Sequence, residues 1–551
     1  MEIIGTFKSM INWPWARNLL FIILLTTIFL LCRCQEYIGL FPSGPHSWRQ
    51  ADCLSITDNY FSNGMRFFQP EFHYLISDGG KQGYTAGEFP GLYYLNALLW
   101  IIFGKHIFIT RSVSVIITFL GLFALYKTYW NVSQNYFWSV IWPLLIFCTP
   151  VIAEYGMSFL TDVPGFCFAL MGWYFFEKYR GSSKDVDLIS TAILFMIAGL
   201  LKVSSLILFV VILVLWFFEL IGFRFGRNGK PIFNRLILQG FILSFSLMGV
   251  FSWYAFVHQF NSLHDGAYMA TKAYPIWSLS TDQVINQAVG FWEWSAMLAL
   301  PTFLWFALPV ILILGIALLR YTPVFYRMVY SLTAVGVLMY LALWYQAIDK
   351  HDYYFVNAFA LIAVLPLPFL TSDVKAPRWA INLFWFLGIV ALIYGLTYTR
   401  HNLELRHNPS DRFAYPLTPH NTVELMRYYH WERNDRIGAL SDSGIQLFLD
   451  SLGVDKEKKV VIFPDDTPNL TLLMIDRKGW SSAGHMYGTP LRTILDSKIA
   501  LDADFLIVLQ PDVYEEPGMC EFEQHRIGKF KNVEVVDLNK FADNRLQAID
   551  I

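Results

Sequence analysis

The chain has 551 residues, of which 55% are apolar, 17% aromatic and only 15% charged. This composition is too hydrophobic for an ordinary soluble protein of that length and is typical of a multi-pass membrane protein. The net charge of −2, with no basic stripe along any segment, argues against a nucleic-acid partner.

Apolar segments of membrane-spanning length recur along the chain. A hydrocarbon core of about 30 Å takes roughly 20 helical residues, with about 17 to 25 as the working range. The first apolar run is followed by no small-residue cleavage site, so we interpret it as a retained span and not as a signal peptide. On these criteria we predict eleven spans, at about 17–34, 107–126, 136–154, 163–179, 186–201, 203–222, 233–257, 297–319, 328–347, 353–370 and 379–397.

The apolar run 91–104 is too short to cross a bilayer and is predicted to form an interfacial or re-entrant helix. With eleven spans and the N-terminus inside, nearly all short basic loops fall on the cytoplasmic side, as the positive-inside rule requires. The opposite side, periplasmic or an equivalent outer compartment, then receives the loop 35–106, the later outer turns and the C-terminal region. This topology predicts a protein of the cell inner membrane with its unusual polar residues on the outer side.

Asp52 and Asp162 stand out on that outer side. Asp52 lies near the start of the first outer loop in "HSWRQADC", and Asp162 lies at the outer end of the fourth predicted span in "FLTDVPG". Charged groups near bilayer depth cost several kcal/mol unless they are paired or hydrated, so their collection on one face indicates a functional site. A helix N-cap is the alternative for Asp162, because Pro164 suits the first turn of a helix.

Further charged residues follow on the same side. Glu88 in "GEFPGLYY" precedes the short apolar helix, and capping that helix is the alternative to a functional role. Lys202 interrupts an apolar sequence at an outer turn, and "DKHDYY" brings His351 and Tyr353 to another. Cations at headgroup level suit a phosphate, although lysines also reach the interface by snorkelling.

The sequence offers one candidate set of metal ligands. His258 and His264, together with Glu88, offer the imidazole and carboxylate ligands that divalent ions take. Their spacing is not a recognised ligand pattern, so we assign no cofactor and no metal ligand, and a divalent ion stays an open alternative. The six cysteines show neither metal-ligand spacing nor a disulfide framework.

The composition changes after about residue 400 to mixed charge with short β-branched runs. Strand-like segments at 458–463, 502–509 and 532–538 alternate with helix-like segments at 443–453 and 490–498. This pattern predicts a small α/β domain with a mostly parallel sheet. The stretch "DDTPNLTLLMIDRKGW" (465–480) follows a predicted strand end, where such sheets bind ligands, but it is also typical of a helix cap and loop.

The predicted fold class is therefore an α-helical polytopic membrane protein with about eleven spans, interfacial helices and a small C-terminal α/β soluble domain. We place the transmembrane domain at 1–400, with its large first outer loop at 35–106, and the extracytoplasmic domain at 401–551.

Several of these motifs together resemble the glycosyltransferase C superfamily. They are the first loop that opens with an Asp, "GEFPGLYY" leading into a short helix that ends "FG", Arg111 near the next span, the Asp of "FLTD", and "GLLK" at an outer turn. More narrowly, the pattern is similar to the bacterial branch related to aminoarabinose transferase and protein O-mannosyltransferases, in a subgroup with a Trp-Arg-Gln-x-Asp motif. The similarity covers about residues 15–400.

The resemblance implies a sugar donor carried on a polyprenyl phosphate such as undecaprenyl phosphate, and inversion at the anomeric carbon. The acceptor would be a hydroxyl of lipopolysaccharide, another envelope glycan, a lipid or a protein. Asp52 would be the general base and Asp162 a second carboxylate of the substrate pocket. Glu88 matches the Glu of the family's "EKPP"-type segment, but Phe89 stands where many relatives have Lys, so Arg49, Lys202 or His351 would bind the phosphate.

The residues of "WRQAD" suit this reaction. Displacing a phosphate from an anomeric carbon needs a base within about 3 Å of the attacking hydroxyl and positive charge at the leaving oxygen. Asp52 supplies the base, and Arg49 and Gln50 are expected to orient the donor phosphate or the acceptor. Trp48 is expected to pack on a sugar face or to hold the loop at the interface.

Two other functions stay open beside a hexosyl or pentosyl transferase. A lipid-linked glycan ligase would use a diphosphate-linked polymer in place of a monophosphate sugar. A membrane transporter would also have many spans, but the sequence shows no internal repeat and its polar residues gather on one side.

Overall fold

The computed structural model describes residues 13–226, 229–266, 273–374, 377–409, 420–485 and 488–541. These residues are mostly helical and contain one five-stranded sheet. The chain divides into two compact units. The first comprises Met1–Leu40, Ile107–Trp253 and Lys272–Val423, and the second comprises Phe41–His106, Tyr254–Thr271 and Glu424–Ile551.

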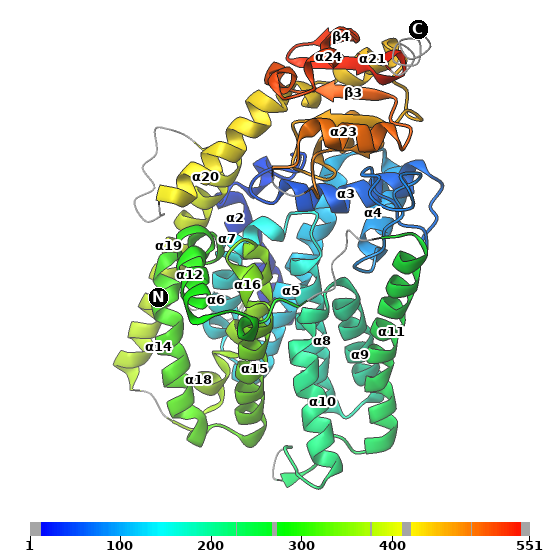
Figure 1. Cartoon of the computed structure of the whole chain (residues 1–551). Coiled ribbons are helices and arrows are strands. Elements are labelled where there is room, and N and C mark those ends of the chain that lie inside the picture. The colour runs from blue at the N-terminus through cyan, green and yellow to red at the C-terminus, as the bar shows by residue number, and fades with distance from the viewer. Residues whose placement is uncertain are drawn as a thin grey trace. The chain divides into compact units, whose positions relative to one another are not determined.

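Long apolar helices make up most of the first unit (Figure 1). Among the described residues, eight helical segments are long and apolar enough to cross a membrane, so this is a multi-pass membrane protein. Large side chains on them are exposed, such as Phe241, Phe251 and Phe386, as expected of surfaces that face lipid. The eight segments are α2 (Pro14–Leu31), α5 (Ile107–Ser133), η2 with α10 (Val203–Leu220), α11 (Leu236–Leu263), α14 with η6 (Thr302–Tyr321), α15 (Val324–Leu343), η7 to α18 (Asp352–Thr371) and α19 (Arg378–His407).

All eight segments coincide with predicted spans. The other three predicted spans are helical too, but they are not among these eight segments. The segment 136–154 is broken into α6 (Tyr136–Phe147) and α7 (Pro150–Tyr155), because Pro150 lacks the N–H that would continue the helix and holds Thr149 extended. The other two are the helices α8 (Asp162–Ser182), which carries charged residues at both ends, and α9 (Asp185–Leu201), which has 17 residues.

Small residues allow the central helices of this unit to pack closely. A side chain at Gly121 of α5 would collide with Cys167 of α8, and one at Gly172 of α8 would collide with Phe195 of α9. Close backbone approach at small residues is a general feature of membrane helix packing. The described part of the unit is completed by η1 (Cys34–Glu36), η4 (Ile276–Ser278), α12 (Thr281–Gly290), η5 (Phe291–Ser295), α13 (Ala296–Ala299), α16 (Tyr345–Ile348) and α17 (Phe359–Val364).

Two helices of the segment 35–106, which the sequence predicted as the first outer loop, belong to the second unit. Helix α3 (Ser47–Ser62) is buried along most of its length although it is rich in polar residues, and its lack of an apolar period is why the sequence did not predict a helix there. Helix α4 (Gly91–Phe103) has 13 residues, which agrees with the expectation that this run is too short to cross a bilayer.

The C-terminal part of the second unit alternates helices and strands. It contains α21 (Gly444–Ser451), β1 (Val460–Phe463), α23 (Leu491–Ile499), β3 (Phe505–Val508) and β5 (Val533–Asp537), each of which lies in, or ends one residue beyond, a segment that the sequence predicted. The sequence had not assigned α20 (His420–Trp431), which runs into this unit, η8 (Glu432–Arg436), η9 (Gly438–Ser441), α22 (Leu470–Ile475), β2 (Gly479–Trp480), η10 (Pro511–Glu515), α24 (Cys520–Glu523) and β4 (Arg526–Phe530).

The sheet has the strand order β2-β1-β3-β5-β4 and is mixed. Strand β1 pairs in parallel with β2 and β3, whereas β5 pairs antiparallel with β3 and β4. The prediction of a mostly parallel sheet was therefore wrong for this edge. Only two residues separate β4 from β5, and so short a connection can join only antiparallel strands.

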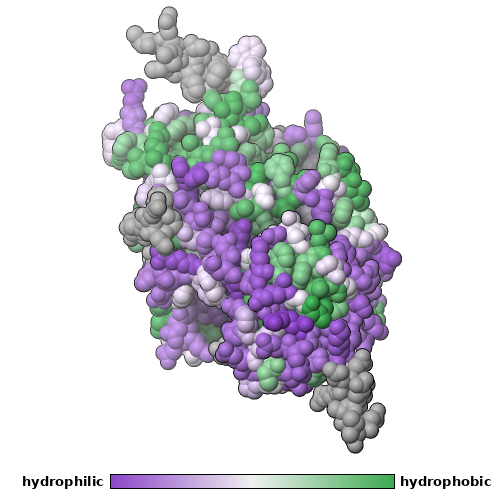
Figure 2. Space-filling model, turned by 90° about the horizontal axis from the view of Figure 1, so that it is seen from above, coloured by the Kyte–Doolittle hydropathy of each residue, from purple (hydrophilic) through white to green (hydrophobic). Residues whose placement is uncertain are grey.

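The molecular surface is shown from one side in Figure 2. On this face, hydrophilic side chains cover much of the surface and hydrophobic side chains form patches among them.

Candidate active site

Three predicted site residues lie together in the second unit. Arg49 and Asp52 are three residues apart on α3 and so share one face of the helix. The Nη1 atom of Arg49 lies 3.7 Å from Oδ2 of Asp52, and its Nη2 atom donates to Oε2 of Glu88 at 2.7 Å. Their side chains are 12%, 1% and 14% exposed for Arg49, Asp52 and Glu88, so water screens these interactions little. The result is a buried cluster of two carboxylates and one guanidinium.

The environment of this cluster keeps Arg49 charged and the neighbouring thiol neutral. Burial alone would lower the pKa of Arg49, but the acidic groups around it, the Glu88 carboxylate foremost, outweigh this effect, so the pKa of Arg49 lies above its usual value. Burial raises the pKa of Cys53 to about 12. The Tyr93 hydroxyl lies 3.1 Å from Sγ of Cys53 and 3.2 Å from Oε2 of Glu88. A protonated thiol is not a nucleophile, so Cys53 fills space beside the carboxylates.

Glu88 does not occupy a capping position. The N-cap position of α4 belongs to Pro90, and Glu88 turns to Arg49. The sequence thus placed Glu88 beside the correct helix, but its alternative role as a cap is not the one that the structure shows.

Asn469 is a member of this cluster that sequence reasoning missed. Its Nδ2 atom donates to Oδ1 of Asp52 at 2.8 Å, and both side chains are buried. Asn469 lies in the "DDTPN" turn after β1, at a sequence separation of 417 residues from Asp52. No periodicity or spacing could have joined two residues so far apart; the only signal was the position of the turn at the end of a parallel strand.

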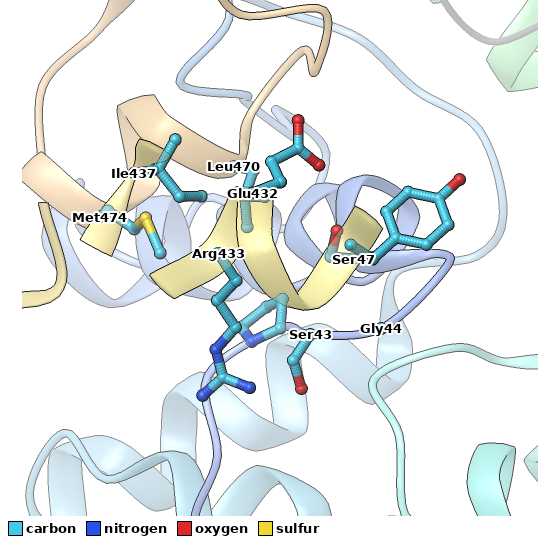
Figure 3. A pocket seen from close by; sticks show the side chains of 10 residues that line it. Ser43, Gly44, Ser47, Glu432, Arg433, Ile437, Leu470 and Met474 are labelled. Carbon is cyan, nitrogen blue, oxygen red and sulfur yellow. The ribbon is translucent and has the colours of Figure 1, made fainter. Parts of the chain in front are cut away.

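Gln50 and Trp48 lie on the first turn of the same helix, α3. Gln50 donates from Nε2 to the carbonyl oxygen of Ser43 at 3.1 Å and so fixes the turn that precedes α3. Trp48 is half-buried on the first turn of the helix. The segment that leads into α3 forms one wall of the pocket in Figure 3. The pocket is lined by Pro42, Ser43, Gly44, Ser47, Tyr429, Glu432, Arg433, Ile437, Leu470 and Met474. None of the predicted site residues lines the pocket, although Ser47 begins the helix that carries Asp52.

A second cluster of predicted residues lies in the first unit. Asp162 is the first residue of α8, with Thr161 at the N-cap position, and its Oδ1 atom lies 3.1 Å from Nζ of Lys202. The same Nζ lies 4.9 Å from the ring centroid of Tyr354 and 5.9 Å from that of Tyr353. His351 packs against both tyrosine rings. The structure therefore brings four predicted residues, Asp162, Lys202, Tyr353 and His351, into one aromatic and charged cluster.

The same unit contains a buried ion network that the sequence did not predict. Arg406, at the end of α19, donates from Nη2 to Oδ2 of Asp352 at 2.5 Å, and the Tyr155 hydroxyl donates to Oδ1 of Asp352 at 2.6 Å. His407 lies 2.8 Å from Oε2 of Glu154. Buried charges that are paired in this way hold elements in place, and here they fix the end of α19 to α7 and to the "DKHDYY" turn.

One group in the described part of the chain has the composition of a metal site, and it contains none of the predicted histidines. The ligand atoms of Asp58, His73 and Asp476 lie within 4.8 Å of one another. Each carboxylate also has a lysine: Lys105 lies 2.6 Å from Oδ1 of Asp58, and Lys456 pairs with Asp476. These lysines balance the two negative charges, so we interpret the group as an ion network. His264 is bonded through Nδ1 to the carbonyl oxygen of Phe260 at 2.8 Å.

Comparison of the sequence with protein-family models and with curated proteins finds no match. Solved structures do match. ArnT from Cupriavidus metallidurans in the apo state is similar over 94% of this chain and 97% of its own, with 12% identity and a TM-score of 0.54; its undecaprenyl-phosphate complex gives 10% identity and the same TM-score. An Archaeoglobus fulgidus oligosaccharyltransferase tethered to an acceptor peptide is similar over 91% of this chain and 69% of its own, with 14% identity and a TM-score of 0.54.

The arabinofuranosyltransferase AftD from Mycobacteria is similar over 94% of this chain and 39% of its own, with 13% identity and a TM-score of 0.50. Identities this low carry information about the fold alone. The chain shares its fold with ArnT and with the archaeal oligosaccharyltransferase, and like ArnT it is mostly helical with a small C-terminal mixed sheet.

Proposed function

We propose that this protein is an integral-membrane glycosyltransferase that moves a sugar from a polyprenyl-phosphate donor to an acceptor hydroxyl, with inversion at the anomeric carbon. The observation that carries the proposal is the Asp52, Arg49 and Glu88 cluster, in which a buried carboxylate and a charged guanidinium lie side by side in a chain with the glycosyltransferase C fold. A base and a cation are the two groups that displacement of a phosphate requires.

The reaction assigns one role to each group of the cluster. Asp52 accepts the proton of the acceptor hydroxyl as its oxygen forms the new bond to the anomeric carbon. The bond between that carbon and the phosphate oxygen breaks, and its electron pair leaves on the polyprenyl phosphate. Arg49 binds the leaving phosphate; a guanidinium has five N–H donors, so its bond to Glu88 does not exhaust it. Glu88 accepts a hydrogen bond from Arg49 and so holds its guanidinium beside Asp52.

The residues of the second cluster are proposed to contact substrate. The ammonium group of Lys202, beside Asp162 and two tyrosine rings, combines positive charge with aromatic surface. The positive charge suits a phosphate, and the aromatic surface suits the face of a sugar ring. We therefore propose Lys202, His351, Asp162 and Tyr353 as substrate-binding residues of the first unit.

A solved structure of similar fold supports the class of donor. An ArnT structure contains undecaprenyl phosphate, and an oligosaccharyltransferase structure contains a tethered acceptor peptide. We extend the first to this chain as the donor's lipid carrier and leave the acceptor as a hydroxyl of an envelope glycan, lipid or protein. The active site and the C-terminal domain are proposed to face the periplasm or an equivalent outer compartment.

The decisive experiment measures release of the lipid carrier. The purified protein in lipid is incubated with undecaprenyl-phosphate hexoses and pentoses and with envelope acceptors, and free undecaprenyl phosphate is quantified. We expect the wild-type protein to release it from at least one donor, and Asp52→Asn to reduce the rate by about 10²- to 10⁴-fold, the usual contribution of a general base.

Asp58→Asn is the matched control because Asp58 is also a buried, ion-paired Asp of α3. It should retain the rate. Release that survives Asp52→Asn would remove Asp52 from the role of base. If the folded wild-type protein releases no lipid phosphate from any monophosphate donor, the proposal is wrong, and diphosphate-linked polymers should then be tested as substrates of a ligase.

A further inference from the structure

The amide of Asn469 is held in one orientation by groups on two other segments, helix α3 and the chain that follows it. Its Oδ1 atom accepts the backbone N–H of Tyr74 at 2.9 Å and the hydroxyl of Ser55 at 3.3 Å. Because Oδ1 faces a backbone N–H donor, the reversed amide would set two donors against each other. The NH₂ end must therefore point the other way, and its Nδ2 atom lies 2.8 Å from Oδ1 of Asp52.

The turn that carries Asn469 is itself fixed. The side chain of Asp465 accepts the backbone N–H of Thr467 at 2.8 Å and its hydroxyl at 2.6 Å, and it also accepts the hydroxyl of Thr471. The Ser481 hydroxyl donates to the carbonyl oxygen of Thr467 at 2.7 Å. The stretch that the sequence left open between a ligand loop and a helix cap is thus a rigid support for one side chain.

Ser55, one partner of Asn469, shares α3 with the proposed base. Ser55 follows Asp52 by three residues, so both side chains lie on the same face of the helix. The Ser55 hydroxyl also accepts the backbone N–H of His73 at 2.9 Å, which ties the chain after α3 to the same point. Asp52 then has Asn469 at Oδ1 and the Arg49 guanidinium 3.7 Å from Oδ2.

We propose that Asn469 of the C-terminal domain is a positioning residue for Asp52, and that this domain completes the catalytic centre by supplying it. The inference rests on the proposed role of Asp52 as the base. The bond to Nδ2 holds the carboxylate in one rotamer and favours its charged form. A carboxylate that has lost this bond would sample other rotamers and take up a proton at a higher pH.

The test combines turnover with a double-mutant cycle. A hydrogen bond to a charged group contributes about 1.5–3 kcal/mol, which corresponds to roughly 10- to 100-fold in rate. We expect Asn469→Ala to lower kcat by that factor in the undecaprenyl-phosphate release assay, with KM changed by less than about twofold. The acid limb of kcat/KM should move to higher pH, and Asn469→Asp should move it further because it sets a second carboxylate against Asp52.

Asn532→Ala is the matched control, because Asn532 is an asparagine of the same domain that donates to the carbonyl oxygens of Arg436 and Leu509. It should lower the melting temperature but leave the pH profile in place. Arg49, 3.7 Å from Asp52, and Glu88 beyond it keep their charges in both asparagine variants. An equal loss of kcat in Asn532→Ala and Asn469→Ala, with neither profile shifted, would reduce Asn469 to a structural role and overturn the inference.

The cycle of Asn469→Ala, Asp52→Asn and the double variant, read from melting temperatures, tests the contact without any substrate. Effects that are not additive are expected, and additive effects would overturn the contact. If Asp52→Asn lowers turnover as expected while Asn469→Ala leaves kcat and the pH profile at the wild-type values, the inference fails alone. If Asp52→Asn keeps the wild-type rate, the proposed function fails, and with it the role of Asn469.

Discussion

At the scale of single residues, the pair of Arg49 and Glu88 sets how much positive charge Asp52 experiences. Glu88→Gln would leave the Arg49 charge less compensated and so favour the carboxylate form of Asp52. We expect roughly a tenfold lower kcat, because the base becomes weaker, and an acid limb of kcat/KM shifted to lower pH. Glu71→Gln is the control, since Glu71 pairs with Lys478 at 2.5 Å in the same unit. A shift of the acid limb to higher pH would contradict this account.

The site residues differ in how far the sequence alone could reveal them. Asp52 and Arg49 stand in one short motif, and Glu88 precedes a short apolar helix, so polar residues in an apolar chain were enough to select them. Asn469, Tyr155 and Arg406 gave no such signal, because each acts through a partner that is far away in the sequence. Contacts of this kind follow from the fold, and no local pattern encodes them.

At the level of elements, Asp476 caps the C-terminal end of helix α22 and joins it to the segment after α3 through His73. Burial alone would raise the pKa of Asp476, but His73, Lys105 and Lys456 outweigh it, so the pKa lies below its usual value of 3.8. A depressed pKa means that the pairing stabilises the fold above about pH 4 and that this contribution is lost as the pH falls toward the folded-state value. We expect Asp476→Asn to cost about 2 kcal/mol at pH 7 and progressively less below pH 4.

The measurement is the melting temperature of both proteins between pH 7 and pH 3. Asparagine tolerates the left-handed backbone of residue 476, whose φ is 55°, so the substitution removes charge without strain. Asp502→Asn is the control because Asp502 is also left-handed, with φ of 64°, and is exposed. A difference that stays constant across the pH range would show that the charge of Asp476 contributes nothing.

Elements with a strong local period were the predictable ones. The long apolar helices and the strands β1, β3 and β5 follow from runs of apolar and β-branched residues. Helix α3 did not, because its buried face is polar and is satisfied by partners from the C-terminal domain such as Asn469. The antiparallel edge of the sheet follows from the two-residue connection between β4 and β5. Strand β4 was not predicted, because its sequence contains no apolar run.

At the scale of the whole molecule, the number of crossings decides on which side the C-terminal domain lies. Eight described segments meet the length and composition of a span, and an even number would put both chain ends on one side. The eleven spans predicted from the sequence put them on opposite sides. Helices α8 and α9 and the broken segment α6 to α7 make the difference, and the basic loops around Lys178, Lys184 and Arg224 support eleven.

Cys520 provides a probe of this question in the natural chain. It is exposed, whereas the other five cysteines are buried. We expect a membrane-impermeant maleimide to label Cys520 in intact spheroplasts, because eleven crossings place the C-terminal domain outside. Cys520→Ser should abolish the signal, which shows that no buried thiol contributes. Labelling that appears only after lysis would put Asp52 and Asn469, which share a unit with Cys520, on the cytoplasmic side, where a transferase that uses outward-facing lipid-linked sugars could not work.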